Sequence, residues 1–145
     1  MSTGRMMENS EQRRFIGTWM LVELGGEGPL VERLGMDAVG VLMYDAAGNM
    51  AVQIMKRRHS VAGLLKSDSE FKSAFQNYVS YFGTYSVDVA NSYIIHHVVG
   101  SLYPRDVGRE LIRRYEFADD LLILTAEGII ADEPIDARLV WKLHR

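Results

Sequence analysis

From Gly17 onward the chain alternates short apolar runs with clusters of Gly, Asp and Asn, which is typical of antiparallel strands joined by turns. Eight runs, rich in Val, Ile, Tyr and Leu, are predicted to be strands: residues 17–24, 38–44, 49–55, 81–88, 92–99, 109–117, 121–126 and 138–144. Eight strands can close a small barrel that still holds one ligand. The pattern therefore predicts an all-β fold, an eight-stranded up-and-down barrel with an internal cavity.

One segment has a helical period instead. Ser67 and Glu70 have the spacing of a capping box, and an apolar stripe follows at helical intervals. The stripe consists of Phe71, Ala74, Phe75, Tyr78 and Val79. It predicts one short helix that lies on the barrel or across its mouth. Residues 25–37 and 56–68 are interpreted as loops longer than a hairpin needs, and such loops often control access to a cavity.

Alternate side chains of a barrel strand face the interior, so the parity of a residue predicts its face. In residues 109–117, one parity is mainly apolar and is expected to face inward, which places one arginine in the interior. The inward set is Leu111, Arg113, Tyr115 and Phe117. The outward set is Glu110, Ile112, Arg114 and Glu116.

Two adjacent histidines, His96 and His97, stand inside the apolar run at residues 92–99. Because neighbouring strand residues point to opposite faces, the two cannot jointly bind one metal ion. A symmetric hairpin with the next strand pairs His96 with Arg113 and Ile94 with Tyr115, and it sends His97 outward. A one-residue slip would instead point His97 inward.

The same pairing argument places Tyr85 on the face that holds His96, so Tyr85, His96 and Arg113 form a candidate site on three neighbouring strands. Burial and the arginine would keep His96 neutral, with one nitrogen free to accept a hydrogen bond. Such a site suits an anionic or enolate-like group. A structural alternative stays open, in which Arg113 lies under a tryptophan at the closed end of the barrel and His96 simply bonds to Tyr85.

Further candidates for ligand contacts are Tyr115, Gln53, Met55 and Trp141. Trp141 and Trp19 each lie on the expected core face of a terminal strand, where they are interpreted first as core plugs. Met55 belongs to a group of methionines that suggests a deformable lining, although core methionines usually just fill gaps. Gln53 is a candidate polar contact on the same strand, and a solvent-facing glutamine fits its position equally well.

The composition excludes several classes of binding partner. The 145 residues suit one domain, predicted as a flexible segment at residues 1–14 followed by a barrel domain at residues 15–145. Sixteen Lys and Arg against 19 Asp and Glu give a net charge of −3, and the charges are scattered, so no nucleic-acid partner is expected. The sequence contains no run of 18 apolar residues, so no membrane span is predicted. The lack of cysteine suits the reducing cytoplasm, where we expect the protein to reside.

No motif identifies a reaction. The chain has no phosphate-binding glycine loop, no histidine spacing for a metal and no GxSxG elbow. We therefore expect neither a metal nor another cofactor. The oligomeric state stays open, with a homodimer as one alternative.

Six segments resemble, in order and spacing, the lipocalin-like domain family of small bacterial and fungal proteins. They are FIGTWMLVEL, VGVLMYDAAGNMAVQIM, YFGTYSVD, HHVVGSLYP, RRYEF and LVWK, and the likeness extends from Phe15 to Lys142. The resemblance implies a calycin-like barrel with a cavity. The GTW motif ending at Trp19 looks like the lipocalin motif whose tryptophan closes one end of the barrel and commonly meets an arginine from a later strand, for which Arg113 is a candidate.

Proteins with related barrels include carriers and cofactor-free enzymes, so the resemblance leaves two main hypotheses. In the first, the barrel binds one small, largely apolar molecule with a polar or anionic group, contacted by Tyr85, His96 and Arg113. In the second, it is a cofactor-independent isomerase, cyclase or dehydratase acting on a small metabolic or natural-product intermediate. Neutral His96 would then move a proton while Arg113 or Tyr85 stabilises negative charge. A purely structural barrel with a filled interior is the third alternative.

Overall fold

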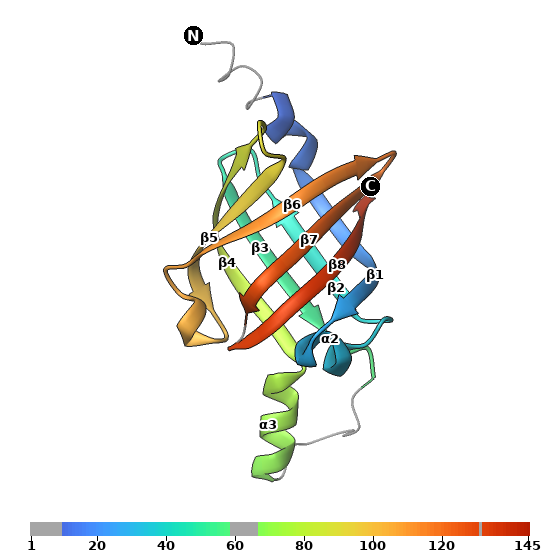
Figure 1. The fold of residues 1–145 in the computed structure, drawn as a ribbon, viewed down its shortest axis with the longest axis vertical. Coiled ribbons are helices and arrows are strands. Elements are labelled where there is room, and N and C mark those ends of the chain that lie inside the picture. Colours follow the sequence, from blue (N-terminus) through green and yellow to red (C-terminus); the bar gives the residue numbers. More distant parts are fainter. Residues whose placement is uncertain (1–9, 59–66, 131) are drawn as a thin grey trace.

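The protein is a closed barrel of eight antiparallel strands, in which each strand pairs with the next and the last pairs with the first (Figure 1). The structure is a computed structural model and describes residues 10–58, 67–130 and 132–145. The strands are β1 (Gly17–Glu27), β2 (Val39–Tyr44), β3 (Asn49–Met55), β4 (Tyr78–Asp88), β5 (Tyr93–Ser101), β6 (Glu110–Ala118), β7 (Leu121–Ile130) and β8 (Glu133–His144). The predicted fold class and strand order are confirmed.

Burial alternates along β6 in the predicted sense. Leu111 and Arg113 are buried, whereas Ile112 and Arg114 are exposed on the outer face. The alternation follows from the pleat of the strand, which sends successive side chains to opposite faces. The interior of the barrel therefore holds the arginine that parity assigns to it.

The pairing of β5 with β6 differs from the symmetric hairpin by two residues. His96 lies opposite Leu111, and Ile94 lies opposite Arg113. The predicted pairing of His96 with Arg113 is therefore wrong. The reason is that β5 continues to Ser101 along β4 alone, so its ladder with β6 ends at His97. A shift of two residues keeps every side chain on its face, and the predicted faces survive it.

One end of the barrel is plugged by an aromatic cluster. Residues 10–15 are helical at the upper end of the barrel in Figure 1, and Phe15 at the end of this segment is fully buried. Its ring packs edge-on against Tyr115 and Phe117, each at 4.9 Å between centroids. Trp19 Nε1 donates to the Phe15 carbonyl oxygen at 2.8 Å. The Arg14 guanidinium lies 4.1 Å from the Phe117 ring centroid, so the arginine at this end is Arg14.

The helical segment is also bonded to the barrel. Tyr115 donates to Glu11 Oε2 at 2.8 Å, and Gln12 Nε2 donates to the Tyr85 hydroxyl at 3.4 Å. The sequence predicts a flexible segment up to residue 14. Within that segment, residues 10–14 are helical and bonded to the barrel, and residues 1–9 lie outside the described residues.

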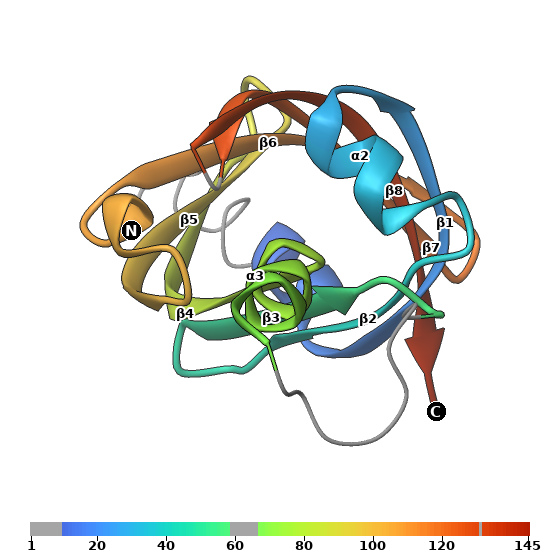
Figure 2. The same cartoon turned by 90° about the horizontal axis from the view of Figure 1, so that it is seen from below.

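The opposite end is covered by a helix that the sequence analysis missed. Residues 25–37 do not form one long loop, because β1 continues to Glu27 and α2 (Pro29–Leu34) follows. Proline is favoured at the first position of a helix, and the side chains of Leu30, Val31 and Leu34 are buried. Figures 1 and 2 show α2 at the lower rim of the barrel, where it contacts β1 and β8.

An ion pair fastens α2 to β8. Arg33 donates from one guanidinium nitrogen to both carboxylate oxygens of Glu133, at 2.8 and 2.7 Å. Its Nε also donates to the carbonyl oxygen of Gln76, the last residue of the helix that precedes β4. We call the contact between Arg33 and Glu133 the latch.

The helix α3 (Asp68–Gln76) begins as predicted but packs differently. The Ser67 side chain accepts a hydrogen bond from the backbone N–H of Glu70 at 3.2 Å, which confirms the cap. The helix ends at Gln76, so residues 78–79 of the predicted stripe belong to β4. None of its side chains is buried, and Phe71 is 55% exposed. The helix projects below the barrel in Figure 1 instead of lying on it.

The loop predicted at residues 56–68 falls partly outside the description, because residues 59–66 lie outside the described residues. None of the helices in the described part of the chain is both long and apolar enough to cross a membrane.

Candidate functional site

The barrel contains an internal cavity of about 50 Å³ at the end that α2 covers. Its lining is mostly aliphatic and includes the three buried side chains of α2. Polar atoms in the lining come from Tyr81, His96, Arg113 and Trp141, of which Arg113 is the only residue with a permanent charge. A water-sized group needs about 10–15 Å³ on this scale, so the cavity holds about three to five of them.

His96 is held by two tyrosine hydroxyls in the interior. It is 2% exposed, its Nε2 lies 2.6 Å from the Tyr44 hydroxyl, and its Nδ1 lies 2.7 Å from the Tyr81 hydroxyl. The prediction that His96 faces inward is therefore confirmed. Two related predictions are wrong, because neither ring nitrogen is free and the partners of His96 are Tyr44 and Tyr81 instead of Tyr85.

The surroundings keep this imidazole neutral. Burial, above all, and the positive charge of Arg113 hold the pKa of His96 well below its ordinary value. Burial also raises the pKa of Tyr44 and of Tyr81, while the Arg113 charge opposes both rises. At neutral pH the three groups therefore form an uncharged hydrogen-bonded chain next to one buried cation.

Arg113 reaches the cavity from β6, where Ala126 of β7 and Ile94 of β5 are its cross-strand neighbours. It is 6% exposed and in hydrogen-bonding position toward Tyr81. Its bond to the carbonyl oxygen of Ile112 is long, at 3.4 Å. Among the described residues of the lining, no carboxylate balances this charge. Arg113 is therefore the natural anchor for an acceptor inside the cavity.

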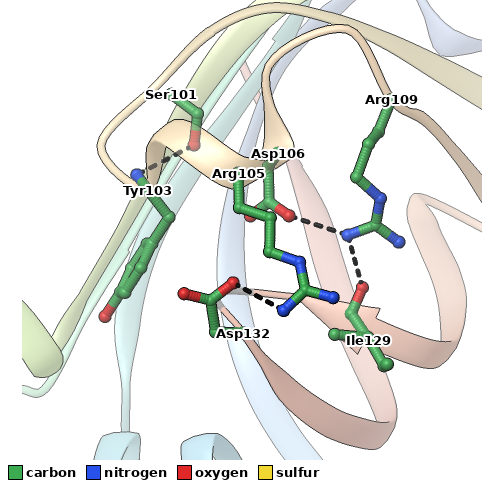
Figure 3. A network of polar contacts seen from close by, with 7 residues as sticks. All are labelled: Ser101, Tyr103, Arg105, Asp106, Arg109, Ile129 and Asp132. Atoms are coloured by element: carbon green, nitrogen blue, oxygen red, sulfur yellow. Dashed lines mark hydrogen bonds and ion pairs between the residues drawn. The ribbon is translucent and has the colours of Figure 1, made fainter.

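A buried carboxylate that acts electrostatically on Tyr81 is already paired elsewhere. Asp106, in the 3-10 turn Pro104–Asp106, accepts from Arg109 at 2.7 Å. Figure 3 shows this pair, with Arg109 also donating to the Ile129 carbonyl oxygen at 2.9 Å. Asp106 does not belong to the cavity lining.

The other candidate residues separate into three groups. Trp141 lines the cavity. Tyr85 and Tyr115 face inward but lie at the plugged end, where Tyr85 donates to the Asp45 carbonyl oxygen and Tyr115 to Glu11. Gln53 and Met55 share the outward parity of β3, so their predicted place in the lining is wrong. Three further methionines, Met20, Met36 and Met43, are also exposed, so they give the cavity no deformable lining.

The two hydroxyls that hold His96 were not among the predicted site residues. Tyr81 lies four residues before Tyr85, which was assigned to the inner face, so extending the parity along β4 predicts Tyr81 on the same face. Gly83 permits this part of β4 to approach β5, since a Cβ there would lie 1.9 Å from the His97 carbonyl oxygen. Tyr44 comes from β2, which pairs with neither β4 nor β5. Its contact with His96 across the interior was therefore invisible to pairing arguments.

His97 lies on the outer face between a serine and a glutamate. Its Nε2 is 2.9 Å from Ser86 Oγ, and its Nδ1 is 3.3 Å from Glu110 Oε1. This order of groups is that of a hydrolase triad. However, the three side chains stand on a solvent-exposed sheet whose strands are paired on both sides, so ladder bonds occupy the backbone N–H groups that an oxyanion hole needs. We assign this trio no catalytic role.

The comparisons with known proteins agree with the fold. A family model described as a lipocalin-like domain matches residues 16–143, nearly the whole chain. No curated protein matches the sequence. The matched segment includes every residue of the cavity lining and all eight strands except His144, the last residue of β8. The chain therefore belongs to the lipocalin-like domain family.

Proposed function

We propose that this barrel binds one small, largely apolar molecule with a polar or anionic group in its cavity. The observation that carries the proposal is Arg113, a buried cation in an aliphatic lining. Leaving such a charge in an apolar interior is costly unless a partner satisfies it. The lipocalin-like fold also suggests small-molecule binding in general, and Tyr81 and Trp141 supply the remaining polar contacts.

The size of the cavity limits the ligand. Drug-sized ligands occupy pockets of roughly 300–1,000 Å³, and this cavity has about 50 Å³. A ligand that fits without rearrangement has only a few non-hydrogen atoms. A larger ligand requires α2 to move, because Leu30, Val31 and Leu34 form that side of the lining.

The proposal is tested by replacing a small residue of the cavity lining with larger ones. Ala126 is buried, lines the cavity and lies beside Arg113, so Ala126→Val and Ala126→Leu should reduce the space step by step. Ala51→Leu, on the outer face of β3, is the matched control. Ligand-observed NMR with acetone, 2-propanol and acetate, which have only a few non-hydrogen atoms each, should detect binding to the wild type and to the control, and progressively less to the Ala126 variants. Binding that both Ala126 variants retain in full would contradict the proposal.

A second candidate function is cofactor-independent isomerisation, cyclisation or dehydration. The observation that favours it is the chain of Tyr44, His96 and Tyr81, which could pass a proton between a buried imidazole and a hydroxyl at the cavity. In this scheme Tyr81 contacts the substrate, His96 acts through Tyr81, and Arg113 stabilises the developing negative charge.

Proton transfer can be measured without knowing the substrate. Small ketones and β-hydroxyketones would be incubated with the protein in D₂O, and deuterium uptake next to the carbonyl followed by NMR. The enzyme hypothesis expects uptake with the wild type and its loss in Tyr81→Phe and His96→Gln while binding persists. A ketone that binds but exchanges no faster than in buffer would favour the carrier.

A further inference from the structure

The direction of the hydrogen bonds around His96 follows from the need to satisfy buried donors. Among the described residues, the buried Tyr44 hydroxyl has one hydrogen-bond partner, His96 Nε2. If Tyr44 accepted from this nitrogen, its own hydrogen would be buried without an acceptor, which is unfavourable. The reverse direction leaves the Tyr81 hydrogen without an acceptor, but Tyr81 lines the cavity, where an occupant can accept it, and Tyr44 does not. Tyr44 is therefore the hydroxyl that donates to Nε2. Since the imidazole is neutral, its single hydrogen is on Nδ1 and is donated to the Tyr81 oxygen.

This direction leaves one hydroxyl hydrogen unused, and it is the one at the cavity. Tyr81 accepts from His96 Nδ1, and the Arg113 guanidinium acts on it electrostatically, so its oxygen is turned toward positive groups. Its own hydrogen has no acceptor among the described residues. Tyr81 lines the cavity, whereas Tyr44 does not. The chain thus presents a hydrogen-bond donor to whatever occupies the cavity.

A third donor comes from Trp141. Its side chain is 1% exposed and lines the same cavity, and Nε1 is buried without a hydrogen-bond partner among the described residues. An indole nitrogen can only donate. Together with the Arg113 guanidinium and the Tyr81 hydroxyl, Trp141 gives the described lining three groups that can donate to an acceptor in the cavity, while the nitrogens of His96 are already bonded.

We infer that the polar group of the ligand is a carboxylate, bound by Arg113, Tyr81 and Trp141, and that the ligand is a monocarboxylate with an apolar remainder. The inference rests on the proposed function, because it names the class of molecule that the cavity takes. A carboxylate has only acceptors and matches the planar fork of arginine. A single negative charge balances the single cation, whereas a phosphate dianion would leave a buried net charge.

The apolar part of the ligand can be short or long, and the carboxylate is the same in both cases. Acetate and propionate approach the size of the cavity, which holds about three to five water-sized groups. A longer fatty acid places the same carboxylate against the donors but needs α2 to shift for its tail. The test therefore includes both chain lengths.

The ligand-side test uses wild-type protein with propionate, propionamide and 1-propanol, which have nearly the same shape, and with octanoate for the longer tail. Affinities come from NMR titration at constant ionic strength. Propionate should bind about tenfold or more tightly than propionamide, because a hydrogen-bonded charge is stronger than a neutral pair. Octanoate binding tighter than propionate would identify the long-chain form, and the reverse order the short-chain form.

The outcomes separate this inference from the proposed function. Equal binding of propionate and propionamide would overturn the carboxylate while the small-molecule site stands. If xenon and all four probes leave the spectra of the cavity residues unchanged, the proposed function itself is wrong, and the inference falls with it.

Variants test the donors one at a time. Arg113→Met should weaken propionate binding about ten- to hundredfold and remove the preference over propionamide. Arg114→Met, which removes the outward arginine next to it, should change neither. Trp141→Phe and Tyr81→Phe should each weaken propionate about three- to tenfold, with circular dichroism confirming the fold. Full propionate affinity in a folded Arg113→Met variant would overturn the inference.

Discussion

The Tyr81 hydroxyl lies 2.7 Å from Nδ1 of His96, while the Tyr44 hydroxyl holds the opposite ring nitrogen at 2.6 Å. These side chains come from β4, β5 and β2, so the contact crosses the interior from one side of the barrel to another. A histidine between two hydroxyls is fully hydrogen-bonded and has a fixed orientation. The polar part of the cavity is therefore rigid before any ligand arrives.

Removing the Tyr44 hydroxyl should destabilise the barrel. In Tyr44→Phe the Nε2 of His96 stays buried without its partner, which costs about 1–3 kcal/mol of the free energy of unfolding. Tyr93→Phe is the control, because Tyr93 is only partly buried and its hydroxyl takes part in none of the described hydrogen bonds. Urea unfolding of both variants measures the difference. Equal stability of the two would show that the hydrogen bond to His96 contributes nothing.

His96 should make stability depend on pH below about 6.5, the ordinary value for histidine. Its folded-state pKa is lowered, by burial first and then by the Arg113 charge. Below about pH 6.5 the unfolded chain therefore binds a proton that the folded protein does not. The free energy of unfolding then falls with decreasing pH, by up to about 1.4 kcal/mol per pH unit from this residue, until the folded-state pKa is reached.

This pH dependence can be isolated by comparing variants. His96→Gln should lose the contribution, so its stability should fall less steeply than that of the wild type between pH 7.5 and 5. His97→Gln leaves His96 in place and should keep the wild-type slope. Urea unfolding at each pH gives the slopes, and an identical slope in His96→Gln would contradict the expectation.

Replacing Arg113 should stabilise the protein without ligand. Its charge is buried in an aliphatic lining with no carboxylate among the described lining residues. Exchanging a buried charge for a side chain of similar length and apolar character removes a desolvation cost, and comparable replacements stabilise by about 1–4 kcal/mol. Arg113→Met should therefore raise the melting temperature measured by calorimetry. A lowered melting temperature would mean that the arginine is better satisfied than its contacts indicate.

Opening the latch should change the rates of binding more than stability. Glu133→Gln removes the charge that holds Arg33 on α2, and the pair is only partly buried, so the loss of stability should be at most about 1 kcal/mol. If α2 covers the way into the cavity, both the association and dissociation rates of a ligand should rise, as stopped-flow tryptophan fluorescence would record. Glu127→Gln breaks an exposed pair with Arg114 on the outer face and serves as control. Unchanged rates would exclude α2 as the cover.

Two phenylalanines at opposite ends of the molecule should respond differently to truncation. Phe15→Ala removes a fully buried ring from the plug and should cost about 3–5 kcal/mol. Phe71→Ala, in the projecting helix α3, should change stability by about 0.5 kcal/mol or less. Thermal unfolding of the two variants provides the comparison. A large effect at Phe71 would mean that α3 packs on the barrel in solution.

The inner faces of the strands could be predicted from the sequence because side chains alternate with a period of two. A register error of two residues between β5 and β6 moved Arg113 from opposite His96 to opposite Ile94, yet both stayed inside. An error of one residue would have reversed them. Parity is therefore a sound guide to the lining, whereas the partner across the strand depends on loop geometry that composition does not reveal.

The contents of the cavity were harder to predict because they depend on both ends of the barrel. Tyr85 and Tyr115 have inward parity but belong to the plug, since residues 10–15 fold against them. The helix α2 was missed although its sequence carries a proline at the first position and Leu30 and Leu34 at helical spacing. Parity along β3 sends Gln53 outward, so the strand excludes it from the lining.

The plug at Phe15 makes the barrel a blind tube. Tyr44 contacts both the Phe15 ring and His96, so the polar groups lie at the deep end, while the aliphatic side chains of α2 lie at the other. An amphipathic ligand that enters past α2 would have to insert its charged group first and its apolar tail afterwards. The charged group would lose its hydration shell next to the leucines of α2 before the hydrogen bonds of Arg113 can replace that water. The selectivity of the barrel would then depend on the free energy of dehydrating the ligand as well as on the fit of the ligand to the cavity.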